Sequence, residues 1–318
     1  MTVKIKKKIS YLLIIIIVLI LCLGSLIYHF LYNIEDKKLN SNEISITNEK
    51  SIIKNIEDKN NKIYNVENIL LLGIDNEENA SDTMIILTID KTSKKIKLSS
   101  LMRDMYVNFG ENKTNKLNYA YHYGGIKFAV KTINEQLKLN IKDYVKVNLL
   151  GLANVIDYMG GVSIDVKSEE IEDLNFHANE IAKLKKIKYK PITKSGYQIL
   201  NGVQTTAYCR IRHVGNEDYQ RTFRQRYCLS QIMKKFTKEP IKQYPTLIKN
   251  LTPYIKTSLT PIEILLILEN YPYYINNGID QIRIPYDGTY RDAFINNIFY
   301  LEWDREKNVK KLSNFIFK

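Results

Sequence analysis

The longest uninterrupted hydrophobic stretch of the chain lies near its N-terminus. Residues 11–32 read YLLIIIIVLILCLGSLIYHFLY, with no charged residue between Tyr11 and Tyr28. About 20 apolar residues suffice for a helix to cross a bilayer, where backbone groups must be satisfied within the segment itself. The pattern therefore predicts a transmembrane helix over residues 11–32.

The charges on either side of this segment predict its orientation. Four lysines precede it, at positions 4, 6, 7 and 8, whereas Glu35 and Asp36 share the exit side with Lys37 and Lys38. The positive-inside rule makes residues 1–10 a cytoplasmic tail and places the chain beyond residue 33 outside the cell membrane. The alternative is a cleaved signal peptide, whose apolar core spans about 7–15 residues before a small-residue cleavage site. The longer run here, with no such site, favours a single-pass anchor.

A polar stretch follows the predicted anchor before regular hydrophobic patterns begin. Residues 33–64 are rich in Asn, Lys, Glu, Ser and Asp, which is typical of an extracytoplasmic stalk. Short apolar runs at 67–73, 84–90 and 96–101 predict three strands. The polar residues 91–94 between the last two predict a hairpin turn.

Helical and strand-like patterns alternate through the rest of the chain. We expect helices from residue 126 to 137, over 151–159, after Asn201, over 219–236 and after the capping box that opens at Thr260. Strand patterns occupy 144–149 and 162–166, and Gly160-Gly161 suits the end of the second helix. This mixture, without a linker, predicts one α/β domain over residues 65–318.

The composition indicates which surroundings suit the protein and which cysteine chemistry is open to it. Lys and Arg outnumber Asp and Glu by 47 to 34, a formal charge of +13. Such a balance favours phospholipid headgroups, anionic polymers or nucleic acid, and the predicted extracytoplasmic position argues against nucleic acid. The lysine-rich run 182–190 is interpreted as a solvated face. Cys22 lies in the apolar run, so a single disulfide bridge, between Cys209 and Cys228, stays open. The sequence has neither a disulfide framework nor a CxxC zinc motif.

Two carboxylates are expected to meet at one edge of the predicted sheet. Asp75 follows the first buried strand, and Asp82 precedes the second. Mg²⁺ in proteins takes one or two carboxylates together with phosphate oxygens of a substrate, which fits this pair. The alternative interpretation is that each aspartate caps a turn.

Arginines follow in places where strands or helices end. Arg103 comes directly after the 96–101 strand, where it either binds a phosphate through both guanidinium edges or forms a surface ion pair with Asp104. If residues 210–212 are extended, Arg210 and Arg212 project to one face and form a fork for both phosphates of a pyrophosphate.

The helix predicted over 219–236 adds further polar side chains. Arg221 and Gln225 stand four residues apart and share a face, whereas Arg224 points elsewhere. His122 and His213 lie near these residues, and we interpret both as packed or hydrogen-bonded rather than catalytic.

Seven motifs follow one another between residues 68 and 235. They are NILLLGID at 68–75, SDTMIILTID at 81–90, SSLMRDMYV at 99–107, KLNYAYHYGG at 116–125, YVKVNLLGLANVIDYMGGVSIDV at 144–166, LNGVQTTAYCRIRH at 200–213 and RTFRQR at 221–226. In identity and order they resemble the LytR–CpsA–Psr family of bacterial cell-wall glycopolymer transferases.

The resemblance implies a fold and a reaction. The fold is a central mixed β-sheet flanked by helices, with an apolar groove for a polyprenyl chain. The reaction moves a glycopolymer, such as teichoic acid or capsule, from an undecaprenyl-pyrophosphate carrier to peptidoglycan, where a phosphodiester forms at a muramic acid hydroxyl. The partners implied are this lipid-linked donor, peptidoglycan and membrane lipid.

The resemblance also assigns roles to residues. It gives Asp75 and Asp82 to Mg²⁺, or Mn²⁺ in its place, and makes these two aspartates and Arg103 catalytic. The residues that match the family's pyrophosphate-binding positions are Arg103, Lys116, Asn118, Arg210, Arg212, Arg221 and Gln225. One position departs from the pattern: Ala80 stands where the family usually has arginine, and Glu77 and Glu78 add negative charge nearby.

The expected mechanism follows from charge. Cleavage of a pyrophosphate leaves negative charge on the departing lipid phosphate, which arginines and a divalent cation would stabilise. As a hypothesis, Asp75 accepts the proton of the attacking hydroxyl. Two alternatives stay open: a hydrolase that uses water as acceptor, and a non-catalytic lipid-carrier binding protein or regulator of envelope functions.

Overall fold

The computed structural model describes residues 38–47, 65–75, 79–110, 113–237, 246 and 250–317. Within these ranges no helix combines the length and the apolar character that a membrane span requires. The predicted tail and transmembrane helix, residues 1–32, lie outside the described residues, as do Glu77 and Glu78.

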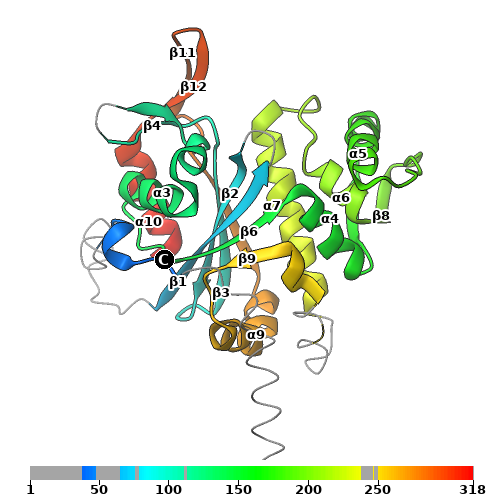
Figure 1. The fold of residues 1–318 in the computed structure, drawn as a ribbon, viewed down its shortest axis with the longest axis horizontal. Coiled ribbons are helices and arrows are strands. Elements are labelled where there is room, and N and C mark those ends of the chain that lie inside the picture. The colour runs from blue at the N-terminus through cyan, green and yellow to red at the C-terminus, as the bar shows by residue number, and fades with distance from the viewer. Residues whose placement is uncertain are drawn as a thin grey trace, which may run out of the picture.

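A six-stranded mixed sheet runs through the centre of the domain (Figure 1). In spatial order its strands are β10 (Ile279–Ile284), β3 (Lys95–Leu101), β2 (Ala80–Asp90), β1 (Val66–Asp75), β6 (Asp143–Asn148) and β9 (Ile255–Thr257). Neighbours β1, β2 and β3 are antiparallel, whereas β6 runs parallel to β1 and β10 parallel to β3. The predicted α/β class with a central mixed sheet is confirmed.

Helices cover both faces of this sheet, which explains the nearly continuous apolar runs of its strands. Because successive side chains alternate between faces, Leu70 and Leu72 pack with α3 (Tyr119–Leu137) and α10 (Arg305–Phe317). Ile69 and Leu71 face the other way, toward α7 (Glu217–Phe236) and α9 (Pro261–Asn276). The sheet and these four helices form the main core.

A smaller layer with its own core lies beside the sheet. It contains α4 (Leu149–Tyr158), β7 (Val162–Val166), η2 (Ser168–Glu170), α5 (Ile171–Lys185), β8 (Gly196–Leu200) and α6 (Gly202–Tyr208). The buried Arg224 of α7 ties this layer to the domain, since its Nε donates to Glu170 Oε1 at 2.7 Å and its guanidinium also reaches the carbonyls of Ile211 and Val214. Arg224 therefore points away from Arg221, as predicted.

Two small antiparallel ribbons complete the described chain, together with the short turns η1 (Ser41–Glu43) and η4 (Thr252–Tyr254). The first ribbon pairs β4 (Tyr106–Asn108) with β5 (Thr114–Lys116). The second is a hairpin of β11 (Tyr290–Ile295) and β12 (Ile298–Trp303) that projects from the domain (Figure 1).

The predicted elements recur with shifted boundaries. Asn201 caps α6, the capping box at Thr260 opens α9, and Gly160 and Gly161 end α4 with φ of 72° and 81°. The helix predicted over 126–137 is the second part of α3. It begins directly after Gly124 and Gly125, whose non-helical φ and ψ separate it from a first helical piece that starts at Tyr119.

Part of the predicted stalk packs against the domain. Ile44 is fully buried in the core that α3 covers, and its carbonyl accepts a hydrogen bond from Asn134 Nδ2 at 2.9 Å. Thr47 N donates to Leu139 O at 3.0 Å, and Lys38 pairs with Glu263 of α9 at 2.9 Å. Residues 38–47 thus join the domain through both apolar and polar contacts.

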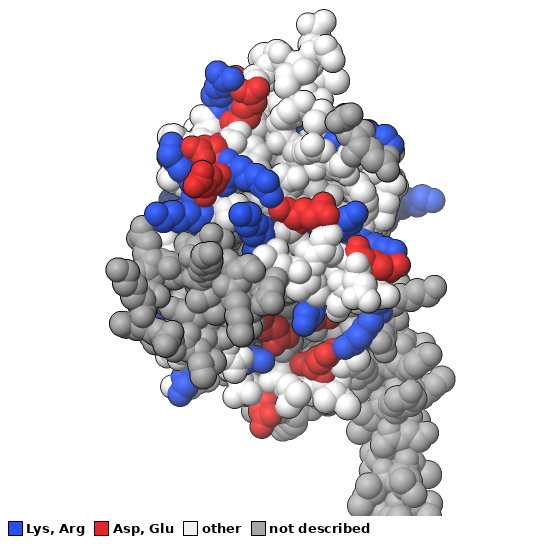
Figure 2. Space-filling view, turned by 90° about the vertical axis from the view of Figure 1, so that its left-hand side faces the viewer, with Lys and Arg blue, Asp and Glu red and all other residues white. Residues whose placement is uncertain are grey.

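Basic and acidic side chains are interspersed over the face of the domain shown in Figure 2. Opposite charges also meet directly, as in the ion pair between Lys127 of α3 and Glu43 of η1 at 2.7 Å. Cys209 and Cys228 both carry free thiols.

Candidate functional site

The first part of the site forms where β1 turns into β2. Gly73 pairs with Thr83 but Ile74 pairs with Ser81, so Asp82 is the extra residue of a β-bulge. A bulge redirects a side chain at the end of a strand. Asp75 pairs with Ala80 at the same end of this hairpin. The two predicted carboxylates therefore belong to one edge of the sheet.

Arg103 connects this edge to two other carboxylates. Its Nη1 donates to Asp82 Oδ1 at 2.6 Å, and its Nε lies 3.4 Å from both Asp104 Oδ2 and Asp218 Oδ2. Burial of the guanidinium works against its charged form, but the three carboxylates outweigh burial and raise the pKa of Arg103. Asp104 is buried, so its ion pair with Arg103 is not the surface pair considered from the sequence.

Lys116 and Asn118 lie beside this cluster, in line with the family motif. Lys116 Nζ is 2.7 Å from Asp104 Oδ1. The backbone N–H of Asn118 donates to Arg103 O at 3.1 Å, and its carbonyl accepts from Ser81 N at 3.4 Å. Asn118 Oδ1 is buried without a hydrogen-bond partner among the described residues. Unpaired buried polar atoms are uncommon in folded proteins, where a water molecule, an ion or a ligand often supplies the partner.

The centre of the site is a carboxylate that sequence reasoning did not select. Asp218, in the first turn of α7, has its Oδ1 3.3 Å from Arg212 Nε. Its Oδ2 lies 3.0 Å from Arg221 Nη2, besides the contact with Arg103. Burial raises the pKa of Asp218, although Arg103 and Arg212 favour its ionised form. The available signal was its position three residues before Arg221, on the same helical face.

The segment from Arg210 to Arg212 differs from the prediction. It follows α6 as a turn and irregular chain rather than as a strand, so the condition for a fork of Arg210 and Arg212 on one strand face is not met. Ile211 is buried, while Arg212 joins Asp218 and Arg210 Nη1 lies 3.5 Å from Glu180 Oε2 of α5. The two guanidinium groups thus contact different carboxylates.

Asp173 explains the shape of this turn. Its Oδ2 accepts hydrogen bonds from the backbone N–H groups of Arg212 at 3.0 Å and His213 at 3.2 Å. Burial alone would raise the pKa of Asp173, but these bonds and the His213 side chain lower it. Asp173 was missed because it lies 39 residues before Arg212 in the chain.

Gln225 and Arg221 occupy the same face of α7, as predicted. Gln225 Nε2 donates to Cys209 O at 3.4 Å, close to the turn that carries Arg210. Arg221 is almost fully buried, and its Nε has no hydrogen-bond partner within the described part of the chain. A buried guanidinium with an unused donor is suited to an anionic ligand.

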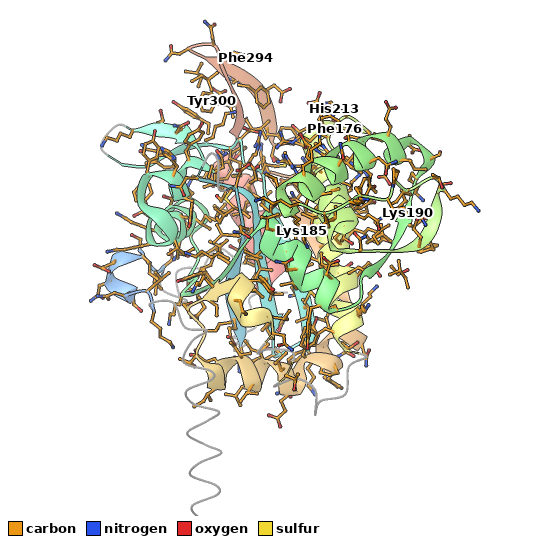
Figure 3. The ribbon with its side chains drawn as sticks, turned by 45° about the vertical axis from the view of Figure 1, so that its right-hand side comes forward. Phe176, Lys185, Lys190, His213, Phe294 and Tyr300 are labelled. Atoms are coloured by element: carbon orange, nitrogen blue, oxygen red, sulfur yellow. The ribbon has the colours of Figure 1, made fainter. Side chains whose placement is uncertain are left out.

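Aromatic side chains flank Lys116. Its Nζ lies 5.7 Å from the ring centre of Phe299 and 5.9 Å from that of Tyr300, both on β12. Figure 3 shows Tyr300 near the base of the projecting hairpin and Phe294 near its tip. His213 is mostly exposed and bonds to Asp173, and His122 packs against Tyr119, so both histidines have structural surroundings.

Charges of opposite sign therefore converge from five parts of the chain. The cations are Arg103, Lys116, Arg212 and Arg221, and the carboxylates within the same network are Asp82, Asp104 and Asp218. Ala80 is fully buried, and β2 carries no Lys or Arg. The arrangement can bind an anion of several charges through guanidinium groups.

The LytR_cpsA_psr family model matches residues 28–315. The chain belongs to this family. It is 28% identical over 289 residues to the polyisoprenyl-teichoic acid–peptidoglycan teichoic acid transferase TagU of Bacillus cereus, with 89% of each chain covered.

Solved structures share the fold of this LytR_cpsA_psr protein. A protein from Enterococcus faecalis described as a transcriptional regulator superposes with a TM-score of 0.63 at 27% identity, covering 79% of this chain and 87% of that one. The LytR-CPS2A-psr family protein YwtF (TagT) with bound octaprenyl pyrophosphate lipid superposes with a TM-score of 0.61 at 23% identity. In that comparison 81% of this chain and 95% of the other are covered.

Proposed function

We propose that the protein transfers a glycopolymer from an undecaprenyl-pyrophosphate carrier to peptidoglycan. The convergence of Arg103, Arg212 and Arg221 on the single carboxylate of Asp218 carries this proposal. Three guanidinium groups around one small anion form a preorganised place for phosphate oxygens. The relative named as a teichoic acid transferase and the related structure with a polyprenyl pyrophosphate support the same donor class.

The arginines would act on the departing lipid phosphate. The bond that breaks joins the bridging oxygen of the pyrophosphate to the phosphorus of the transferred phosphate. As it breaks, negative charge grows on the departing lipid phosphate. Arg103 and Arg221, held in place by carboxylates and largely removed from water, stabilise that charge without having to reorganise. Lys116, with its Nζ beside Asp104 and the aromatic rings, neutralises a further phosphate oxygen.

A divalent cation fits the charge balance of the site. Counting Asp75 at the end of β1, the network holds four carboxylates against the four cationic side chains Arg103, Lys116, Arg212 and Arg221. A pyrophosphate would therefore make the site strongly anionic, and Mg²⁺ bound through Asp75 and Asp82 would offset that charge. Across the described residues no three His, Cys, Asp or Glu side chains gather as a metal site, so phosphate oxygens would supply further ligands. When bound, Mg²⁺ or Mn²⁺ supplies Lewis-acid stabilisation of the phosphate.

Asp75 is the proposed base for the attacking hydroxyl. Its place at the end of β1, on the strand face that also carries Ile69 and Leu71, directs it to the side of the sheet that α7 covers. Arg221 belongs to that helix. With the base on this side and the arginines around the leaving group, the hydroxyl would attack and the lipid phosphate would leave at the same phosphate.

Residues 11–32 provide the proposed membrane anchor. A single span with its N-terminus in the cytoplasm would tether the domain on the outer side of the cell membrane, where a lipid-linked donor is confined. Protease protection in right-side-out vesicles tests this: only residues 1–32, the tail together with the span, should be protected. Protection of residues 65–318 would overturn the topology and favour an intracellular regulator.

The proposed reaction is tested with the full chain in lipid vesicles, a radiolabelled lipid-linked glycopolymer and isolated peptidoglycan. We expect label to become covalently attached to peptidoglycan. Arg103→Lys should lower the rate by about 10²–10³, because lysine lacks the fork that spans three carboxylates. The matched control is Arg291→Lys on the exposed face of the β11–β12 hairpin, which should retain full activity.

The two alternatives give different products in this assay. Release of free glycopolymer phosphate, with no attachment to peptidoglycan, would identify a hydrolase. Donor binding without any turnover would identify a lipid-carrier binding protein.

A further inference from the structure

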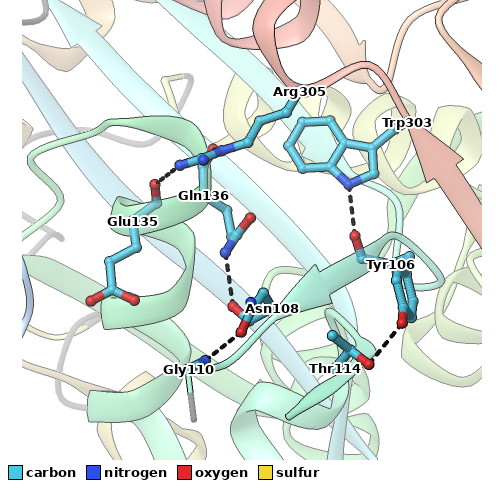
Figure 4. A pocket seen from close by; sticks show the side chains of 8 residues that line it. All are labelled: Tyr106, Asn108, Gly110, Thr114, Glu135, Gln136, Trp303 and Arg305. Atoms are coloured by element: carbon cyan, nitrogen blue, oxygen red, sulfur yellow. Dashed lines mark hydrogen bonds between the residues drawn. The ribbon is translucent and has the colours of Figure 1, made fainter. Parts of the chain in front are cut away.

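A pocket of about 600 Å³ lies beside the β4–β5 ribbon (Figure 4), and none of its lining residues belongs to the arginine cluster. Tyr106, Asn108 and Thr114 of the ribbon, Gln136 of α3 and Trp303 of β12 line it. Elements from three parts of the chain thus build its walls. Its volume falls in the range of pockets that enclose small organic ligands.

One face of the ribbon connects this pocket to the phosphate site. Tyr106 pairs with Lys116 and Asn108 pairs with Thr114, so the side chains of all four project to the same face. The side chain of Val107, between Tyr106 and Asn108, points to the opposite face, where it is buried in the main core. Two residues along a strand cover about 7 Å. To reach the end of the ribbon where Lys116 contacts Asp104, a ligand of several rings in the pocket passes over Tyr300, whose ring contacts Tyr106 and lies 5.9 Å from Lys116 Nζ.

Aromatic rings give the pocket a rigid apolar surface. The indole N–H of Trp303 donates to Tyr106 O at 2.9 Å, which fixes the ring (Figure 4). Tyr106 meets Tyr300 edge to face, with ring centres 5.0 Å apart, and Tyr106 OH donates to Thr114 Oγ1 at 2.8 Å. Rings held in this way offer flat faces to the C–H side of a sugar ring.

Planar amides supply hydrogen-bonding groups next to these rings. Gln136 Nε2 donates to Asn108 O at 2.8 Å, and Asn108 Oδ1 accepts from Gly110 N at 2.7 Å. Within the described residues, this leaves Gln136 Oε1 as an acceptor and the Asn108 amide N–H groups as donors. The charged lining residues are Glu135 and Arg305, one of each sign. Their balance fits a neutral ligand that bears hydroxyl and amide groups.

We propose that this pocket binds a neutral glycan of N-acetylated amino sugars and holds it as the acceptor. The binding part follows from the pocket's aromatic and amide lining; the acceptor part rests on the proposed transfer reaction. The shared ribbon face then brings a sugar hydroxyl toward Lys116 and the phosphate site. The pocket thereby selects the acceptor separately from the donor.

The chain offers a built-in reporter for this pocket, since Trp303 is its one tryptophan. The full chain in detergent is titrated with a tetramer of β-1,4-linked N-acetylglucosamine while tryptophan emission is recorded. We expect a saturable change in intensity or wavelength, and none with a glucose tetramer of the same linkage. An emission unchanged by the acetylated tetramer up to about 10 mM, a millimolar-weak limit, would overturn the proposal.

Two variants locate the binding. Gln136→Ala removes an amide, and Asn108→Asp removes the amide donors while its side chain still accepts from Gly110 N. Each should weaken binding about five- to tenfold, the effect of one or two hydrogen bonds. The matched control is Gln198→Ala on β8, whose Nε2 likewise donates to a backbone carbonyl, at 2.7 Å. Equal affinities of all three variants for the acetylated tetramer would refute its assignment to this pocket.

Transfer assays separate this proposal from the proposed function. Asn108→Asp should raise the KM for a glycan acceptor about five- to tenfold and leave kcat and the KM for the donor unchanged. Transfer with an unaltered acceptor KM would overturn the acceptor role alone. If the chain bound the sugar saturably, the variants weakened this binding and no transfer occurred, the glycan site would stand. The proposed function would then be wrong.

Discussion

Asp218 Oδ2 accepts a hydrogen bond from Arg221 Nη2 at 3.0 Å, one turn farther along α7. The same carboxylate also lies within 3.4 Å of Arg103 and Arg212. It thus occupies the position among the guanidinium groups that an anionic ligand would take. A carboxylate in such a place organises the arginines and competes with the ligand.

Asp218→Asn should therefore bind inorganic pyrophosphate about tenfold more tightly, since removal of one competing charge of this size changes binding by about 1.4 kcal/mol. Transfer should become slower, because Arg103 and Arg212 lose the carboxylate that positions them. Calorimetric titration with pyrophosphate and Mg²⁺ measures the affinity. Asp165→Asn, which removes the half-buried partner of the exposed Lys167, is the control. Weaker pyrophosphate binding by Asp218→Asn would contradict the competition.

Asp75→Asn and Asp82→Asn should each raise the Mg²⁺ concentration needed for half-maximal transfer by about tenfold or more, because a hard cation loses one of two charged oxygen ligands. The measurement is the initial rate as a function of Mg²⁺ concentration. Asp292→Asn, at an exposed position on β11, should leave the curve in place. Metal-dependent transfer that stays intact in Asp75→Asn would remove its roles as base and ligand.

The buried pair of Lys97 and Asp90 should control acid stability. Lys97 Nζ lies 2.9 Å from Asp90 Oδ2 and 2.8 Å from Ile316 O, with both side chains at most 5% exposed. Burial would raise the pKa of Asp90, but hydrogen bonds from Ser93 and Lys97 outweigh it and lower the pKa below 3.8. The stability from this group is therefore complete above the unfolded pKa and disappears as the pH falls through the folded one.

Asp90→Asn should lower the free energy of unfolding by about 3 kcal/mol at pH 7, because it leaves Lys97 charged and buried. The difference from the unaltered chain should shrink below pH 3.8, where Asp90 becomes protonated in the unfolded chain. Urea unfolding at several pH values checks both points. Asp280→Asn breaks the exposed pair with Lys95 and should cost less than about 1 kcal/mol. A pH-independent difference would argue against the titration of Asp90.

Asp173→Asn should impair transfer without unfolding the domain. One carboxylate oxygen accepts two backbone N–H groups, from Arg212 and His213, and an amide is a weaker acceptor for both. We expect about a tenfold loss of kcat/KM for the donor, as Arg212 becomes less well placed, with an unchanged circular dichroism spectrum. Glu172→Gln, exposed one residue earlier on α5, is the matched control. Full activity of Asp173→Asn would show that the turn keeps its shape without this clamp.

Part of the linear order of elements could be predicted from the sequence, because these elements depend on local periodicity and capping. Apolar runs predicted β1 and β3, Asn201 predicted the start of α6, and the four-residue spacing predicted that Arg221 and Gln225 share a face. Periodicity also failed locally. It left open whether residues 210–212 are extended, and the structure has no strand there: hydrogen bonds to the distant Asp173 hold the backbone of Arg212 and His213.

What the sequence by itself determined is the mixed α/β class, the motif that carries Asp75, Asp82 and the arginines, and the prediction of a membrane anchor before them. These features rest on neighbouring residues and regular spacing. Only the tertiary structure decided that Asp218 joins three arginines, and that Gln136 and Trp303, 167 positions apart in numbering, line one pocket. Such contacts arise from packing between remote elements, and no local pattern along the chain encodes which side chains will meet.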